Sequence, residues 1–200
     1  KLNSTPVIFM SFKGCSGNNE KDLIESFRKV IQKEYKRFYK LFKNSTKISE
    51  DYKDFLTTFE FFSEEPIKET QNEFERITRI KLMLPYALDT LIETLYEYYK
   101  IKPIFILDEY DNPFIEAKNN GYYKDIKDTL SEMFVSTFKG NKYLDRALMT
   151  GIQRIAHESI FSKFNNPLIC TVVDEIYSDK FGLTEEETIE YLEYFGYELN

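Results

Sequence analysis

The chain has 200 residues and a mass of 23.9 kDa, the size of one large domain or of one domain with part of a second. Apolar residues make up 42% of it and aromatic residues 16%, which is enough for a buried core and excludes a wholly disordered chain. The net charge of -7 argues against direct binding to nucleic acid or to an anionic membrane, since both need clustered basic residues.

Two cysteines, Cys15 and Cys170, are too few for a disulfide framework. We expect both to be buried, reduced thiols of a cytoplasmic protein. No apolar run approaches the roughly 18 residues that a membrane-spanning helix needs. The sequence opens with "KLNSTPVIFM", without an initiator Met or the charged start of a leader peptide, so we expect a piece of a longer chain.

Strand-like and helix-like segments alternate along the chain, which predicts an α/β fold with a mainly parallel sheet flanked by helices. The first strand is expected from Pro6 to Phe12, and its nearly continuous apolar character is typical of a strand covered on both faces. Helices are predicted, in chain order, over Glu20–Phe42, over 50–62 with Ser49 as cap, over the ambiguous segment 67–82, over 86–99, over 122–138, over 158–164 and after Thr184. Further strands are predicted over 103–108, over 145–151 as a short buried strand, and over 168–173, and a turn over 109–114.

The stretch "PIFILDEYD" carries the strongest chemical signal, because an apolar strand ends there in Asp108 and Glu109. A parallel strand delivers the residues that follow it to the carboxyl edge of the sheet, where ligands bind in open α/β folds. Asp108 would hold a magnesium ion, and Glu109 would orient or deprotonate an attacking water. The competing interpretation is a strand end whose acids face solvent.

The matching phosphate-binding loop is not found. Such a loop reads G-x-x-x-x-G-K-[ST] between a strand and a helix, and none of the seven glycines is followed by Lys and then Ser or Thr. The nearest candidate is "KGCSGNN", with Gly14 and Gly17. We favour a plain glycine-rich turn there over a degenerate phosphate loop.

Thr150 and Arg154 form a third candidate set, because Thr150 ends a predicted strand and Arg154 follows shortly after it. They could sense a γ-phosphate by hydrogen bond and by charge, or serve only as a strand end and a surface cation. The single histidine, His157, has no Cys/His cluster that would make it a metal ligand. A metal-dependent phosphodiesterase using Asp108, Glu109 and Asp111 is a weaker alternative, since no Lys-bearing nuclease motif follows.

Four blocks together resemble the AAA-ATPase-like family of bacterial and lower-eukaryotic proteins. They are "PVIFMSFKG", "PIFILDEYDNPF", the stretch from "GYYKDIKDTL" to "TGIQRIAHESIFSKFNN", and "YSDKFGLTEEET". Members are P-loop NTPases that are often fused to a restriction-endonuclease-like region. The resemblance covers essentially the whole chain.

The resemblance implies a three-layer P-loop fold of the AAA-like branch that binds ATP and Mg²⁺. Asp108 and Glu109 would be its Walker B pair and Thr150 its sensor, while Arg154 matches an arginine of less certain role. The family has a strand and a Walker A loop upstream of the first strand seen here, so we expect the fold to be incomplete at its N-terminus.

The resemblance also implies a domain division and a strand order. Residues 1–182 would be the core without Walker A, and 183–200 the start of a truncated helical region. Strands 6–12, 103–108 and 145–151 would neighbour one another in that order, and the strand over 168–173 would either pair with the last of these or pack poorly.

We therefore expect the Walker B and sensor portion of an ATPase domain, inactive in isolation. The nucleotide would be its ligand in a full-length parent, with no nucleic-acid or membrane partner. The alternative is a non-enzymatic remnant or interaction module that keeps the scaffold without nucleotide binding.

Overall fold

The computed structural model describes residues 4–43, 51–63, 72–152, 167–171, 173–177, 180 and 182–197. The chain divides into two compact units, Lys1–Asn165 and Asn166–Asn200. The predicted domain boundary between residues 182 and 183 stays a prediction. Within the described ranges, no helix combines the length and the apolar character that crossing a membrane would need.

The first unit holds a three-stranded parallel sheet and five helices among its described residues. In chain order they are β1 (Val7–Ser11), α1 (Glu20–Phe42), α2 (Asp51–Ser63), α3 (Glu73–Tyr99), β2 (Ile104–Asp108), α4 (Asn112–Asn119), α5 (Tyr123–Phe138) and β3 (Arg146–Met149). The α/β class with a parallel sheet is confirmed, and so is the predicted order of its strands, β1-β2-β3.

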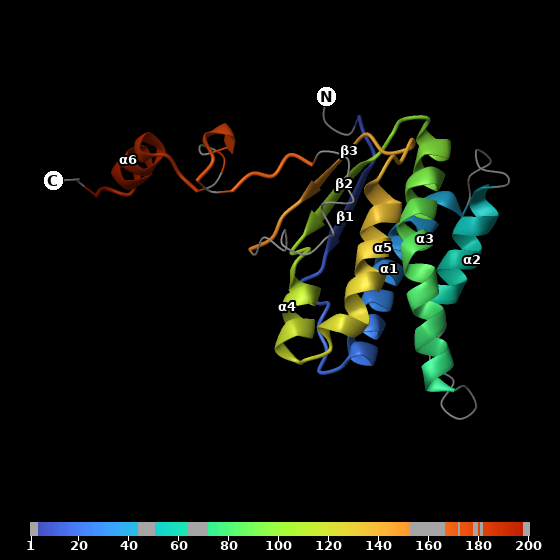
Figure 1. The fold of residues 1–200 in the computed structure, drawn as a ribbon. Helices are drawn as coiled ribbons and strands as arrows, with labels where there is room; N and C mark the ends of the chain where they lie inside the picture. Colours follow the sequence, from blue (N-terminus) through green and yellow to red (C-terminus); the bar gives the residue numbers. More distant parts are fainter. Residues whose placement is uncertain are drawn as a thin grey trace. The chain divides into compact units, whose positions relative to one another are not determined.

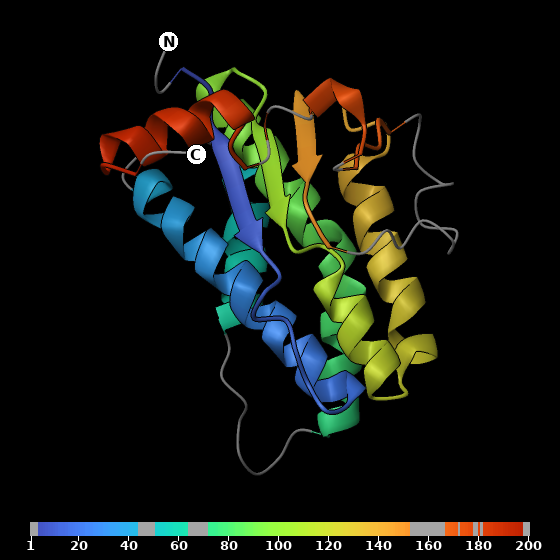
Figure 2. The same cartoon turned by 90° about the vertical axis from the view of Figure 1, so that its left-hand side faces the viewer.

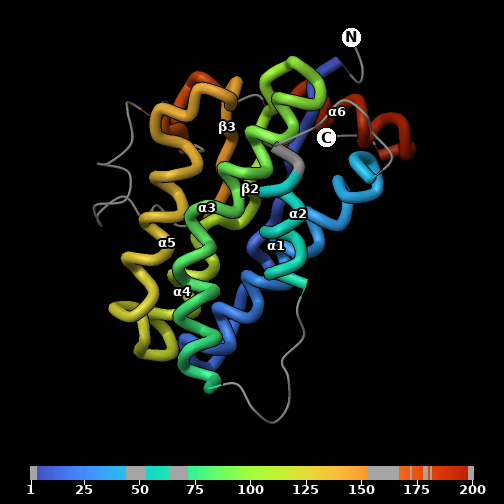
Figure 3. The backbone as a smooth tube through the Cα atoms, turned by 90° about the vertical axis from the view of Figure 1, so that its right-hand side faces the viewer, coloured from blue at the N-terminus to red at the C-terminus, as the bar shows by residue number. Residues whose placement is uncertain are grey.

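In this unit, α1, α2, α3 and α5 gather on one side of the sheet, and α4 lies beyond the carboxyl ends of the strands (Figure 1). Figure 2 looks onto the sheet and shows its three strands side by side. Figure 3 looks onto the helix layer and shows α3 between α5 and α2. α3 packs against both of these helices. The predicted covering of both faces is therefore seen on one face only among the described residues.

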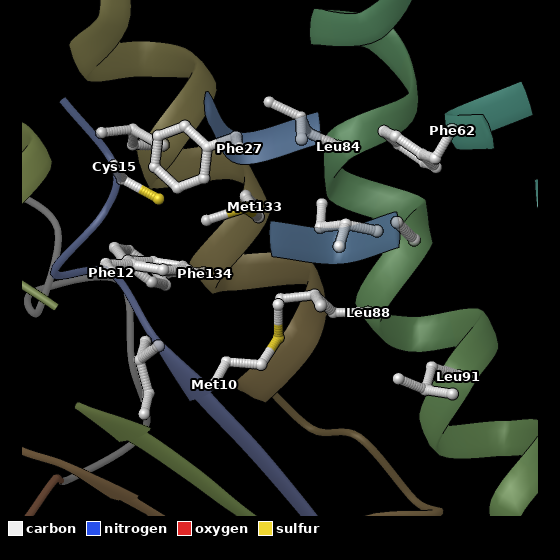
Figure 4. Packing of buried hydrophobic residues seen from close by; sticks show 14 of the residues in the cluster. Met10, Phe12, Cys15, Phe27, Phe62, Leu84, Leu88, Leu91, Met133 and Phe134 are labelled. Atoms are coloured by element: carbon white, nitrogen blue, oxygen red, sulfur yellow. The ribbon is translucent and has the colours of Figure 1, made fainter. Parts of the chain in front are cut away.

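The core forms between the sheet and this helix layer. Alternate strand residues such as Ile8, Met10, Phe105 and Leu107 are buried, as the two-residue period of a strand dictates. Figure 4 shows Met10 and Phe12 reaching toward side chains of α3 and α5, among them Leu88 and Phe134. Phe12 meets the ring of Phe27 edge-on, with the ring centroids 4.9 Å apart.

The opposite face of the sheet carries apolar side chains that stay in contact with solvent. Val7 is 37% exposed, Phe9 53% and Leu148 56%. Parallel sheets are ordinarily buried on both faces, which is why their strands are apolar throughout. The register places Phe9 beside Ile106 and Ile106 beside Leu148, so these residues form one row across the three strands.

The two edges of the sheet differ. Along β1, the carboxylate of Glu34 on α1 accepts a hydrogen bond from the Phe9 N–H at 3.3 Å, and Arg37 donates to the Val7 carbonyl at 2.8 Å. These bonds occupy edge groups that another strand would use. β3 pairs only with β2 among the described residues, and its residues Arg146, Ala147 and Leu148 are exposed. The prediction that this strand is buried was wrong.

Several other local predictions can be compared with the structure. The predicted turn over 109–114 was partly wrong, because α4 begins at Asn112 with Pro113 in its first turn, where a missing N–H costs nothing. The part of the expected segment 67–82 that α3 contains, from Glu73 on, and the expected segment 86–99 form one helix, which continues through Pro85. Ser49 and the predicted helix over 158–164 lie outside the described residues.

The second unit contains α6 (Glu185–Tyr194) and the 3-10 turn η3 (Glu175–Tyr177). The helix predicted after Thr184 is confirmed, and Thr184 and Glu187 form a capping box with both reciprocal hydrogen bonds present. The strand predicted over 168–173 was wrong, since 167–171 and 173 adopt no strand. An apolar run becomes a strand only where a neighbour pairs with its backbone, and the described part of this unit holds no other strand.

Candidate functional site

Asp108 and Thr150 meet at the carboxyl edge of the sheet, where β2 and β3 end. The hydroxyl of Thr150 donates a hydrogen bond to Oδ1 of Asp108 at 2.7 Å. The Thr150 N–H continues the ladder by donating to the Leu107 carbonyl at 2.9 Å. Because side chains alternate along a strand, Asp108 shares its face with Ile104 and Ile106, the face that the described helices of the first unit do not cover.

Glu109 has an unusual backbone. Its φ is +52°, in the left-handed region, and Lys100 is the only other non-glycine residue with a positive φ in the described part of the chain. A side chain in that region costs about 1–2 kcal/mol. The carbonyl of Glu109 accepts the Asn112 N–H at 3.1 Å, which closes the tight turn between β2 and α4. The half-buried side chain follows directly on Asp108.

Asp111, the third acid of the sequence motif, does not join the other two. Its side chain is only 2% exposed, and its Oδ2 accepts a hydrogen bond from the Ile152 N–H at 2.9 Å. No group of three or more His, Cys, Asp or Glu residues in the described ranges could hold a metal ion. The arrangement therefore opposes a three-carboxylate phosphodiesterase centre.

Arg154 and His157 lie outside the described residues. Thr150 and Asp108 are brought together, and Glu109 adjoins them in the chain. The roles of Asp108, Glu109, Thr150 and Arg154 in catalysis or metal binding stay predictions.

Asn112 is a residue of this site that the sequence did not single out. Its side-chain amide donates to the carbonyls of Phe12, Cys15 and Lys13 at 3.1, 3.2 and 3.4 Å. One side chain thereby ties the loop after β1 to the turn after β2. The Asn-Pro pair at the start of α4 was the available sequence signal, but it specifies a turn and not the partners of the amide.

The "KGCSGNN" loop has the wrong chemistry for phosphate. At the start of α1, Asn19 caps the helix by accepting the Asp22 N–H at 3.0 Å, and Glu20 and Asp22 place two carboxylates in the first turn. Negative charge there repels an anion that a free helix N-terminus would attract. A Cβ on Gly17 would lie 2.5 Å from the backbone N of Leu23, so close packing explains that glycine.

The donor set can be tested against the Mg²⁺ and ATP that the family resemblance implies. Magnesium in phosphoryl-transfer sites is held by one or two carboxylates together with substrate phosphates and waters. Asp108, with an adjacent hydroxyl 2.7 Å away, fits such a shared site and not a site built from protein ligands alone.

The fold and the site thus define an α/β protein with a carboxylate–hydroxyl pair at the carboxyl edge of its parallel sheet. The family model described as "Predicted AAA-ATPase" matches residues 1–161, which is most of the chain. The chain belongs to the AAA-ATPase-like family. Comparison with curated proteins and with solved structures gave no match.

Proposed function

We propose that this chain carries the metal- and water-facing half of an ATP-hydrolysing site and is inactive in isolation. The observation that carries the proposal is the 2.7 Å hydrogen bond from Thr150 to Asp108, which joins the candidate sensor directly to the candidate magnesium ligand. Membership of the AAA-ATPase-like family supports it independently.

Each of the three residues would have a distinct part. Asp108 would hold the magnesium ion, which neutralises charge developing on the phosphates when it is bound. Glu109 would hold the attacking water and accept its proton. Thr150 has a single hydroxyl proton, so it can donate either to Asp108 or to a phosphate oxygen, and a nucleotide would be sensed by that exchange. Arg154 would add positive charge near the phosphates.

We further propose that a segment outside this sequence supplies the phosphate-binding loop. Three features support this division: the sequence lacks the loop motif, and among the described residues β3 has an unpaired edge and the apolar face that carries Asp108 is left uncovered. The β1 edge is closed by Glu34 and Arg37. A further strand would therefore add next to β3, beside Thr150.

The alternative function is a non-enzymatic interaction module, and the exposed apolar face of the sheet favours it. Surfaces of this kind bind other proteins as readily as they accept a further layer of the same fold. A phosphate-binding loop in the parent polypeptide would favour the ATP-hydrolysing site over the interaction module, because an interaction module has no need of such a loop.

The test is ATP turnover by the full-length parent polypeptide with single replacements at the site. Glu109→Ala should abolish turnover while ATP binding is retained, and Asp108→Ala should weaken the dependence on Mg²⁺. Asp128→Ala, at an exposed carboxylate of α5, is the matched control and should leave turnover unchanged. Normal turnover in both site variants would refute the assignment.

A further inference from the structure

Asp111 is a buried carboxylate whose hydrogen bond points away from its own helix. It occupies the residue before α4, but its side chain makes no capping bond to that helix. Its Oδ2 instead accepts the N–H of Ile152, 41 residues further along the chain, at 2.9 Å. Burying a carboxylate is costly unless it is hydrogen-bonded, so this contact needs a structural reason.

Gly151 shows how closely the two segments approach. A Cβ added there would lie 2.5 Å from Oδ1 and 2.8 Å from Cγ of Asp111, and 2.8 Å from Cε1 of Tyr110. These distances are shorter than real Cβ contacts. Only glycine lets the backbone after β3 rest directly on the Asp111 carboxylate.

The backbone is fixed on both sides of Thr150. Before it, β3 pairs with β2, and the Thr150 N–H itself donates to the Leu107 carbonyl at 2.9 Å. At Thr150, the carbonyl accepts the Tyr110 N–H at 3.1 Å, and two residues later Asp111 holds Ile152. A residue fixed in this way keeps its hydroxyl within reach of Asp108.

We propose that Asp111 is a positioning residue, which fixes the segment 150–152 so that the Thr150 hydroxyl stays on Asp108, and that it does not bind metal. The inference rests on the proposed function for its catalytic consequence. Its structural content, the hold of Asp111 on Ile152, stands on the geometry alone. The second Asp of "DEYD" thus acts on the site through the backbone that follows a different strand, β3.

The structural content is tested on this chain by hydrogen exchange of the Ile152 amide. Asp111→Ala removes a charge-assisted hydrogen bond and should reduce protection of that amide about tenfold or more. Asp111→Asn keeps an acceptor oxygen and should restore most of it. Asp128→Ala should leave it unchanged. Equal protection in the wild type and Asp111→Ala would overturn the proposal.

Asp111→Ala could unfold the protein, so Gly151→Ala provides a second route. The added methyl group displaces the backbone from the carboxylate, and the Ile152 amide should again exchange faster while circular dichroism stays native. Unchanged protection in Gly151→Ala would count against the proposal just as strongly.

The functional content is tested by ATP turnover of the parent polypeptide. Asp111→Ala should lower kcat about tenfold with little change in KM, and Asp111→Asn should recover most of kcat. If Asp111 acts through Thr150, the double variant Asp111→Ala/Thr150→Val should be no slower than Thr150→Val alone. Multiplying losses would overturn the positioning role.

The turnover and hydrogen-exchange experiments distinguish a failure of the proposed function from a failure of the positioning role. A parent polypeptide without any ATP turnover would refute the proposed function, while hydrogen exchange would still decide whether Asp111 holds Ile152. Tight Mg²⁺ binding by this chain that is lost in Asp111→Asn would show a metal ligand and refute the positioning role.

Discussion

Replacing Glu109 with glycine is expected to stabilise the fold while it removes the proposed catalytic carboxylate. The wild-type residue has a φ of +52°, a conformation that costs a residue with a Cβ about 1–2 kcal/mol. Glycine avoids this cost but loses about 0.5–1 kcal/mol in backbone entropy. The net gain in the free energy of unfolding should be about 0.5–1 kcal/mol, which raises Tm by about 2–3 °C for a unit of this size.

The assay is urea unfolding of Glu109→Gly and Glu109→Ala. Both variants lack the carboxylate, but only alanine keeps the strained backbone, so their difference isolates the strain. Lys100, with a φ of +54° at the end of α3, provides the matched control, since Lys100→Gly should gain a similar amount at a site without proposed chemistry. If Glu109→Gly is no more stable than Glu109→Ala, no strain is stored at this turn.

Replacements at two further positions and one labelling reaction test the packing and the site. Thr150→Val should lower the free energy of unfolding by about 1–2 kcal/mol, because the Asp108 carboxylate loses a donor, while Thr150→Ser should retain most of it in the same urea assay. Phe12→Ala should cost about 3–5 kcal/mol as a cavity opens in the core. Burial raises the pKa of the Cys15 thiol to about 12, which leaves roughly one thiolate in ten thousand at pH 8. A thiol reagent should therefore label only the partly exposed Cys170 in the native protein and both cysteines in urea; rapid labelling of two native thiols would contradict the buried position of Cys15.

Features encoded by local signals could be predicted from the sequence. The helix over Glu20–Phe42 was predicted with its observed bounds, because its apolar positions recur at helical spacing. Gly140 and Gly196 follow the ends of α5 and α6 and have the positive φ that favours glycine there, which is a local signal of a helix end. Both cysteines are free, as predicted, and Cys15 is buried, but the predicted burial of Cys170 was wrong because it is partly exposed.

Features that depend on distant neighbours could not be predicted. The exposure of β3 depends on what lies beside it, and its sequence "RALM" resembles that of a buried strand. Two separate helices were expected over 67–82 and 86–99, yet α3 continues through Pro85, and the Pro85 carbonyl accepts the Ser136 hydroxyl at 2.6 Å.

The site was predicted in part for the same reason. The position of Asp108 follows from its place at the end of an apolar strand, and the family resemblance pointed to Thr150. The partners of Asp111 and Asn112 depend on which loops the topology brings together. From the sequence, a carboxylate three residues after a strand is equally compatible with a metal ligand and with a helix cap, and the structure shows Asp111 bonded to Ile152 instead.

Calorimetry of Mg-ATP binding tests most directly whether the nucleotide site is divided between this chain and a segment outside it. The measurement compares the 200-residue chain with the parent polypeptide, each with an Asp108→Ala variant. We predict no binding to the 200-residue chain up to millimolar ATP, and micromolar binding to the parent that is weakened by Asp108→Ala. Micromolar binding to the 200-residue chain that Asp108→Ala removes would contradict the division, and binding to neither polypeptide would contradict a nucleotide site.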